Sequence, residues 1–174
     1  MPDAHRNRNA DPERPLVGFH VGNGYFAVDV PAVREIIAPA DLVSVPHASA
    51  IVRGVTDHRG RVVPIVDLRK RFGLPATTQT RRTKWIIVEA PQGPWLGLVV
   101  DDVTEVFNVT TAHERQAPKL GPDDVARGFS RVYVHDQTLV LVLDLTTIAR
   151  AVEEGGGPVL PPSWNAPALG EGST

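Results

Sequence analysis

The sequence contains no cysteine, carries little net charge and has no long apolar run. Without cysteine there is no disulfide framework, no thiolate metal ligand and no cysteine nucleophile, and a reducing compartment is favoured. A formal net charge of −2 argues against a general binder of polyanions. No run approaches the about 18 apolar residues of a membrane span, and the polar start of the chain lacks the apolar core of a secretory signal. These absences predict a cytoplasmic protein whose partners are other proteins.

The composition predicts one folded core between two disordered tails. Residues 1–15 are polar, and residues 155–174 are rich in Pro, Gly and Ser with no repeating apolar face. The core predicted between them, residues 16–154, is long enough for one domain or for two small subdomains whose boundary is open.

The first part of this core has the pattern of a β-hairpin. Two β-rich runs, Leu16–Val21 and Tyr25–Val30, are joined by Gly22-Asn23-Gly24, and glycine and asparagine tolerate the positive φ angles of a tight turn. After Pro31 the apolar residues Val33, Ile36 and Ile37 recur at i, i+3 and i+4. That spacing predicts a short helix.

The same order recurs about seventy residues later. Two β-rich runs, 83–89 and 95–100, are followed by Asp101 and Asp102, which suit a helix N-terminus. Val103, Val106 and Phe107 then repeat the helical spacing, and Glu35 and Glu105 occupy equivalent places in the two copies.

A second pair of hairpins completes each copy. Residues 54–68 turn at 57–60, and residues 128–145 turn near Asp136-Gln137; Asp67 and Asp144 then stand where a strand passes into a short helix, as capping residues do. The return strands are apolar at successive positions and are predicted to be buried on both faces, with Pro64 on an edge or at a bulge. Two diverged copies of one unit predict an all-β fold with short helices, built from two small barrels.

Motifs for catalysis and cofactor binding are absent. His47, His58 and His113 show no recognised metal-ligand spacing, and there is no nucleophile elbow, phosphate-binding loop or dinucleotide fingerprint. We therefore expect no enzyme activity, no cofactor and no metal.

A local basic cluster leaves nucleic-acid binding open as the rival class. Small β-barrels bind nucleic acids, but they do so with exposed aromatic side chains, whereas Tyr25, Phe26, Trp85 and Trp95 lie in core-like strand patterns. The cluster consists of Arg69, Lys70, Arg71, Arg81, Arg82 and Lys84.

Several segments taken in order resemble the CheW-like domain of chemotaxis coupling proteins. The resemblance lies in Tyr25–Val28, Val33–Ile37, Val45-Pro46, Gly54–Arg69 and Leu98–Val106, and it extends to about Ile148. It implies a pair of packed five-stranded, SH3-like β-barrels without catalytic activity. It further implies an adaptor that couples the cytoplasmic tips of chemoreceptors to the regulatory domain of a CheA-type histidine kinase in membrane-associated arrays.

The resemblance also implies site residues. Val33 and Gly54 match positions linked to receptor binding, although Val33 equally suits a core position and Gly54 a purely backbone role. Glu35, Arg59 and Gly60 match elements associated with partner contacts and shape. Where the family commonly has Asn-Leu before Arg-Gly, this chain has Asp57-His58, which indicates an adaptor dedicated to one receptor or kinase system. An adaptor of a non-motility pathway is the alternative within this reading.

Overall fold

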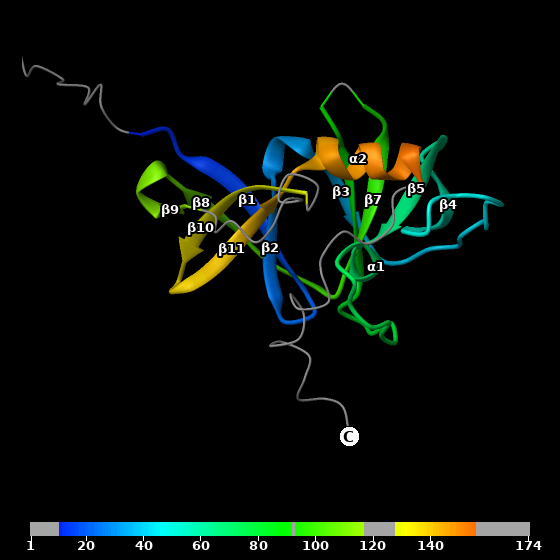
Figure 1. The fold of residues 1–174 in the computed structure, drawn as a ribbon, viewed down its shortest axis with the longest axis horizontal. Coiled ribbons are helices and arrows are strands. Elements are labelled where there is room, and N and C mark those ends of the chain that lie inside the picture. The colour runs from blue at the N-terminus through cyan, green and yellow to red at the C-terminus, as the bar shows by residue number, and fades with distance from the viewer. Residues whose placement is uncertain (1–10, 92, 117–127, 156–174) are drawn as a thin grey trace, which may run out of the picture.

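The computed structural model describes residues 11–91, 93–116 and 128–155, and these form two small β-sheets lying side by side (Figure 1). The first sheet has the strand order β8-β1-β2-β11-β10-β9 and the second has the order β3-β6-β7-β5-β4. The first sheet contains β1 (Arg14–Val21), β2 (Gly24–Asp29), β8 (Asp102–Val109), β9 (Glu114–Arg115), β10 (Phe129–His135) and β11 (Thr138–Leu143). The second contains β3 (Val33–Ile37), β4 (Val52–His58), β5 (Arg61–Asp67), β6 (Lys84–Glu89) and β7 (Trp95–Val100).

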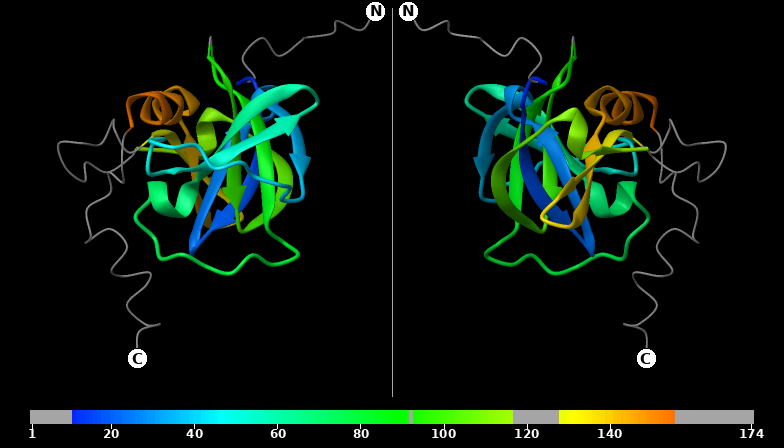
Figure 2. Two further views of the ribbon diagram at one scale, coloured as in Figure 1. Left: turned by 90° about the vertical axis from the view of Figure 1, so that its right-hand side faces the viewer. Right: turned by 90° about the vertical axis from the view of Figure 1, so that its left-hand side faces the viewer.

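Short helices connect or follow the strands. They are η1 (Val30–Ala32), α1 (Leu68–Arg71), η2 (Thr111–His113) and α2 (Leu145–Glu154). The all-β class with few short helices is therefore confirmed, and both sheets are strongly twisted in the end-on views of Figure 2. The first sheet has six strands where five were expected, because the two-residue strand β9 extends its edge.

The two copies in the sequence exchange hairpins between the sheets. The first copy gives β1 and β2 to the first sheet and β3, β4 and β5 to the second; the second copy gives β6 and β7 to the second sheet and β8, β10 and β11 to the first. The strand order of one sheet becomes that of the other when the strands of the two copies are matched in chain order: β1 with β6, β2 with β7, β3 with β8, β4 with β10 and β5 with β11. Each sheet therefore needs both copies, which is a long-range pairing that local sequence patterns do not specify.

The registers of the two sheets support this match. A parallel pair joins the copies in each sheet, with Ala27 opposite Val142 in the first and Gly97 opposite Ile65 in the second. β4 and β10 have an extra residue at equivalent points, Arg53 and Ser130.

The short helices predicted after each first hairpin are wrong, because the chain is extended there as β3 and β8. A bulge at Arg34 adds one residue to β3 opposite β6, and a bulge in β8 before Val106 does the same opposite β1. The extra residue changes the alternation of inward and outward side chains. Apolar residues therefore fall at i, i+3 and i+4 on a strand and imitate a helix, although Ile36 is 40% exposed and Val106 is 64% exposed.

The chain crosses between the sheets at η1 and at Asp101. Asp101 was expected at a helix N-terminus, but it is the single residue between β7 and β8. Its carboxylate accepts a hydrogen bond from the Gly22 backbone N–H at 2.7 Å and from the Arg69 guanidinium at 2.7 and 3.0 Å. This crossing is thereby tied both to the β1–β2 turn and to α1.

Both predicted capping aspartates cap helices. Asp67 accepts from the Lys70 backbone N–H, and Asp144 accepts from those of Thr146 and Thr147. Pro64 does not lie on an edge strand, since β5 is between β7 and β4; the ladder to β7 begins only at Ile65, so the missing proline N–H costs no bond there.

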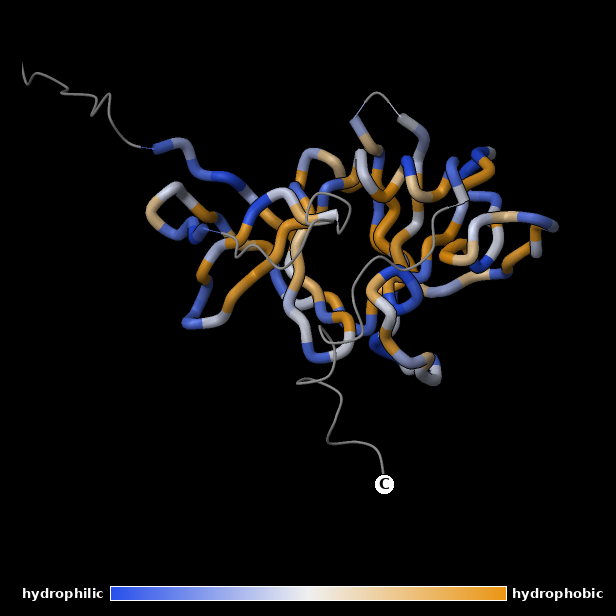
Figure 3. The backbone as a smooth tube through the Cα atoms, viewed as in Figure 1, coloured by the Kyte–Doolittle hydropathy of each residue, from blue (hydrophilic) through white to orange (hydrophobic). Residues whose placement is uncertain are grey.

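One hydrophobic core joins the two sheets, and Figure 3 shows that apolar residues follow strands of both sheets. Phe26 of the first sheet is fully buried, and its ring stacks on Phe72, which follows α1, at a centroid distance of 4.9 Å. The same cluster includes Ile86 and Leu98 of the second sheet. Because these residues come from both sheets, their burial stabilises the sheets together.

The described residues touch only the inner ends of the predicted tails. β1 begins at Arg14, two residues before the predicted start of the core, and α2 ends at Glu154. The predictions for residues 1–10 and 156–174 lie outside the described residues. In the described part of the chain, no helix has the length and apolar character needed to cross a membrane.

Candidate protein-binding site

A carboxylate on β3 meets the turn between β4 and β5. Arg59 donates from Nε to Glu35 Oε2 at 2.9 Å and from a terminal nitrogen to Glu35 Oε1 at 3.1 Å. His58 Nε2 lies 2.9 Å from Glu35 Oε2. Since β3 and β4 are the two edges of the second sheet, the sheet curls until these edges are bridged by side chains at this end.

The turn holds Arg59 in a defined backbone conformation. Arg59 and Gly60 both have positive φ, 52° and 81°, as in the two-residue turns that match the twist of a hairpin. The Asp57 carboxylate accepts a hydrogen bond from the Gly60 N–H at 2.9 Å. A non-glycine residue in the left-handed region costs about 1 kcal/mol or more. This turn and the forked contact with Glu35 together hold the arginine in place.

The side chains of this cluster range from nearly buried to largely exposed. The His58 side chain is 10% exposed and that of Glu35 is 32% exposed, whereas that of Arg59 is 75% exposed. Hydrogen bonds from Arg59, opposed by partial desolvation and aided by the charges of Arg59 and His58, lower the pKa of Glu35. Glu35 in turn raises the pKa of Arg59. The turn therefore presents a fixed cation to solvent, on a carboxylate that remains ionised.

The structure brings three of the five predicted site residues together, namely Glu35, Arg59 and Gly60. Val33 lies on the same strand as Glu35 but is partly buried and packs against the main core. Gly54 lies farther along β4 with φ 156°, and a Cβ there would be 2.6 Å from the Val43 carbonyl oxygen. Gly54 therefore permits the close approach of the segment that contains Val43.

Two features of this end were missed by sequence reasoning. The contact between His58 and Glu35 joins residues 23 positions apart in sequence, for which no local pattern gives a signal. Val62, in the return strand predicted to be buried on both faces, is 73% exposed, and Leu139 at the equivalent place in β11 is 57% exposed. The prediction is wrong at these two positions because each strand begins beyond the core, beside its turn.

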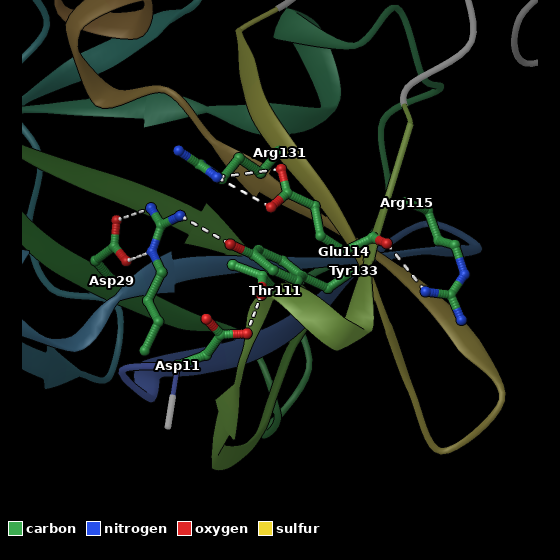
Figure 4. A network of polar contacts seen from close by, with 8 residues as sticks. Asp11, Asp29, Thr111, Glu114, Arg115, Arg131 and Tyr133 are labelled. Carbon is green, nitrogen blue, oxygen red and sulfur yellow. Dashed lines mark hydrogen bonds and ion pairs between the residues drawn. The ribbon is translucent and has the colours of Figure 1, made fainter. Parts of the chain in front are cut away.

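A separate groove of about 720 Å³ contains neither Glu35 nor Arg59. In it Arg14 donates to both oxygens of Asp29 and to the Tyr133 hydroxyl at 3.2 Å, and Arg131 contacts Glu114 (Figure 4). The hydrogen bonds that Arg14 donates to Asp29 raise the pKa of Arg14. These arginines are thus matched by carboxylates, and the groove, which is also lined by prolines and alanines, carries no strong charge of one sign.

The residues considered for metal binding do not converge. His58 faces Glu35, whereas the His113 ring accepts a hydrogen bond from the Thr110 backbone N–H at 3.0 Å. Within the described residues, neither His58 nor His113 forms a group of three potential metal ligands with His47.

The basic cluster is not a free cationic surface. Arg69 pairs with Asp101, Arg71 is buried, and Lys84 Nζ donates to the Arg81 carbonyl oxygen at 2.9 Å. Trp85 is 1% exposed, and Trp95 is partly buried against the core with the Arg61 guanidinium over its ring at 4.3 Å, so the two rings do not form an open platform for base stacking. These contacts weigh against nucleic-acid binding.

The fold and this site define a small β-sheet domain that exposes an ordered, ion-paired turn. The family model of the CheW-like domain matches residues 15–153. The chain is 35% identical over 136 residues to the chemotaxis protein CheW of Rhizobium meliloti, covering 78% of this chain and 86% of the relative. It is 31% identical over 142 residues to the probable chemotaxis protein CheW of Rhizobium etli, covering 81% and 90%.

The chain belongs to the CheW-like family. The fold is shared with a crystal structure of the scaffolding protein CheW of Thermoanaerobacter tengcongensis, with a TM-score of 0.69, 24% identity, and coverage of 76% of this chain and 89% of that one. The family membership confirms the prediction of a non-enzymatic chemotaxis scaffold that acts through protein partners.

Proposed function

We propose that this protein couples the cytoplasmic tips of chemoreceptors to the regulatory domain of a CheA-type histidine kinase, within arrays on the cytoplasmic side of the membrane. Membership of the CheW-like family supports this role. The observation that carries the proposal is the turn at Arg59, because it supplies a rigid and exposed recognition element without any cofactor.

The proposed contact surface is centred on Arg59. Its guanidinium uses Nε and one terminal nitrogen for Glu35, and a guanidinium has five N–H donors. Donors therefore remain for a partner carboxylate or carbonyl. Val62, close by at the start of β5 and 73% exposed, adds apolar area of the kind that lies at the centre of protein interfaces. In this proposal the charge of Arg59 orients the partner, and burial of Val62 adds affinity.

The remaining predicted residues act through shape in this proposal. Gly54 allows the segment with Val43 to lie against β4, and Val43 is 67% exposed. Val33 anchors β3 in the core and so positions Glu35. We assign receptor contact to the surface that these two residues shape, and kinase contact to the turn.

The test is binding of the purified chain to the kinase regulatory region and, separately, to a receptor-tip fragment, by calorimetry. We expect Arg59→Ala to weaken kinase binding about tenfold or more, which is the scale of an interface hot spot. Arg131→Ala is the matched control, because it removes another ion-paired arginine, whose side chain is 48% exposed, from the other sheet.

Each outcome separates the parts of the proposal. Kinase binding that is unchanged by Arg59→Ala while the chain stays folded would refute the assigned surface. A chain that binds neither partner would refute the coupling role itself. Equal loss with Arg59→Ala and Arg131→Ala would show that total charge, and not this turn, determines binding.

A further inference from the structure

The turn between β10 and β11 gathers three potential metal ligands. His135 Nε2 lies 3.0 Å from Glu105 Oε1 and 3.5 Å from Asp136 Oδ2. The three ligand atoms all lie within 4.8 Å of one another. Glu105 comes from β8, so this group joins parts of the chain 30 residues apart, which is why a search for local ligand spacing does not find it.

The equivalent turn of the other copy shows what this group lacks. Glu105 corresponds to Glu35 and His135 corresponds to His58, and both pairs are in contact. The residue that follows the histidine is Arg59 in one copy and Asp136 in the other. One glutamate is thus neutralised by a guanidinium, whereas the other has a second carboxylate near the same imidazole.

The electrostatics around this group favour a cation. The phenol of Tyr25, which hydrogen-bonds to Thr104 at 2.8 Å, has a raised pKa. Burial is the largest cause, and the negative charges of Glu105 and Asp136 add to it. The two carboxylates therefore produce a negative field that extends beyond the group itself.

The geometry suits a small divalent ion. For Zn–N and Zn–O bonds of about 2.0–2.2 Å, tetrahedral ligand atoms are about 3.3–3.6 Å apart. The distances of 3.0 and 3.5 Å from His135 Nε2 are close to this range. The imidazole is also held in place, because Phe107 stacks on it at a centroid distance of 3.9 Å and an interplanar angle of 11°.

We propose that Glu105, His135 and Asp136 form a binding site for a divalent transition-metal ion such as Zn²⁺. The imidazole supplies one nitrogen ligand through Nε2 and each carboxylate supplies one oxygen. Water completes the tetrahedral set, because the Asp136 side chain is 85% exposed and the site is open to solvent. The positive charge of the ion balances Glu105 and Asp136, as the Arg59 guanidinium balances Glu35 in the other copy.

The test is titration of the full chain, without a histidine tag, with Zn²⁺ by calorimetry. We expect one saturable site per chain that D136N and H135Q each weaken about tenfold or more, since loss of even an outer-shell partner costs 10–100-fold. D136R should abolish binding, because it introduces the charge that the other copy carries. H58Q is the matched control: it removes the equivalent histidine and should leave Zn²⁺ binding unchanged.

A second measurement identifies the ligand atom. In the unsubstituted chain, the ¹⁵N chemical shifts of the His135 ring should show that Zn²⁺ binds at Nε2. This measurement does not depend on any substitution. The proposal is overturned if Zn²⁺ does not bind saturably, if binding survives both D136N and H135Q, or if H58Q weakens it as much as they do. Because D136N alters a side chain that is mostly in solvent, misfolding cannot account for its effect.

Discussion

At the turn after β4 a glutamate meets a histidine and an arginine, whereas at the equivalent turn after β10 a glutamate meets a histidine and an aspartate. The backbones of the two turns agree closely, with φ of 52° and 81° at Arg59 and Gly60 and of 47° and 63° at Asp136 and Gln137. The duplicated fold thus preserves the conformation and the Glu–His contact while the exposed charge is reversed. The comparison shows that the backbone of the turn is kept in both copies while the exposed side chains on it differ.

The largest expected effect concerns whether the two sheets unfold independently of each other. We expect Phe26→Ala to lower the free energy of unfolding by about 3–5 kcal/mol, because a fully buried ring is lost from the core that both sheets share. Urea unfolding should remain a single transition by far-UV circular dichroism and by tryptophan fluorescence, to which Trp85 and Trp95 of the second sheet contribute. Two separate transitions would contradict a common core.

A smaller effect should appear when the two turns exchange their last residue. A left-handed conformation costs a non-glycine residue about 1–2 kcal/mol, and the greater freedom of glycine in the unfolded chain offsets about 0.4–1 kcal/mol of this. Gln137→Gly should therefore stabilise the protein by about 0.5–1 kcal/mol, and Gly60→Gln should destabilise it similarly. A Cβ at Gly60 meets no atom within 4 Å, so crowding does not complicate the result. Urea midpoints that shift in the same direction would show that the turns are not equivalent.

The smallest expected effect concerns pH at the Arg59 end. Because the pKa of Glu35 is lower in the folded chain, its ion pair stabilises the fold above the unfolded-state pKa of roughly 4.3. This contribution disappears as the pH falls through the lower folded-state pKa. The difference in unfolding free energy between the native chain and Glu35→Gln should thus shrink below about pH 4.

Arg59→Ala provides the control for this pH dependence. It removes the main cause of the lowered pKa, so the same Glu35→Gln substitution made in that background should show a weaker dependence on pH. A difference that stays constant from neutral to acid pH would contradict the assigned role of the ion pair.

Much of the fold follows from local sequence. The Gly22-Asn23-Gly24 turn, the four hairpins and the capping aspartates Asp67 and Asp144 are set by residues close together in the chain, and the structure confirms them. The helices expected at 33–37 and 103–107 failed because bulges place apolar residues at helical spacing on strands. The exchange of hairpins depends on pairing between distant strands, to which periodicity is insensitive.

The candidate site divides in the same way. Arg59 and Gly60 could be assigned to an exposed turn from sequence, since the turn residues are adjacent. Their contact with Glu35 required the curvature of the second sheet, which brings β3 to the end of β4. Whether any of the five predicted residues touches a receptor or kinase stays a prediction that the binding experiments address.

The short crossings at η1 and Asp101 have a mechanical consequence. The chain passes between the sheets through three residues in one direction and one in the other, and the second crossing is clamped to Gly22 and Arg69. Links this short, held by hydrogen bonds, restrict the rotation of one sheet against the other. We therefore expect the two sheets to move together as one body.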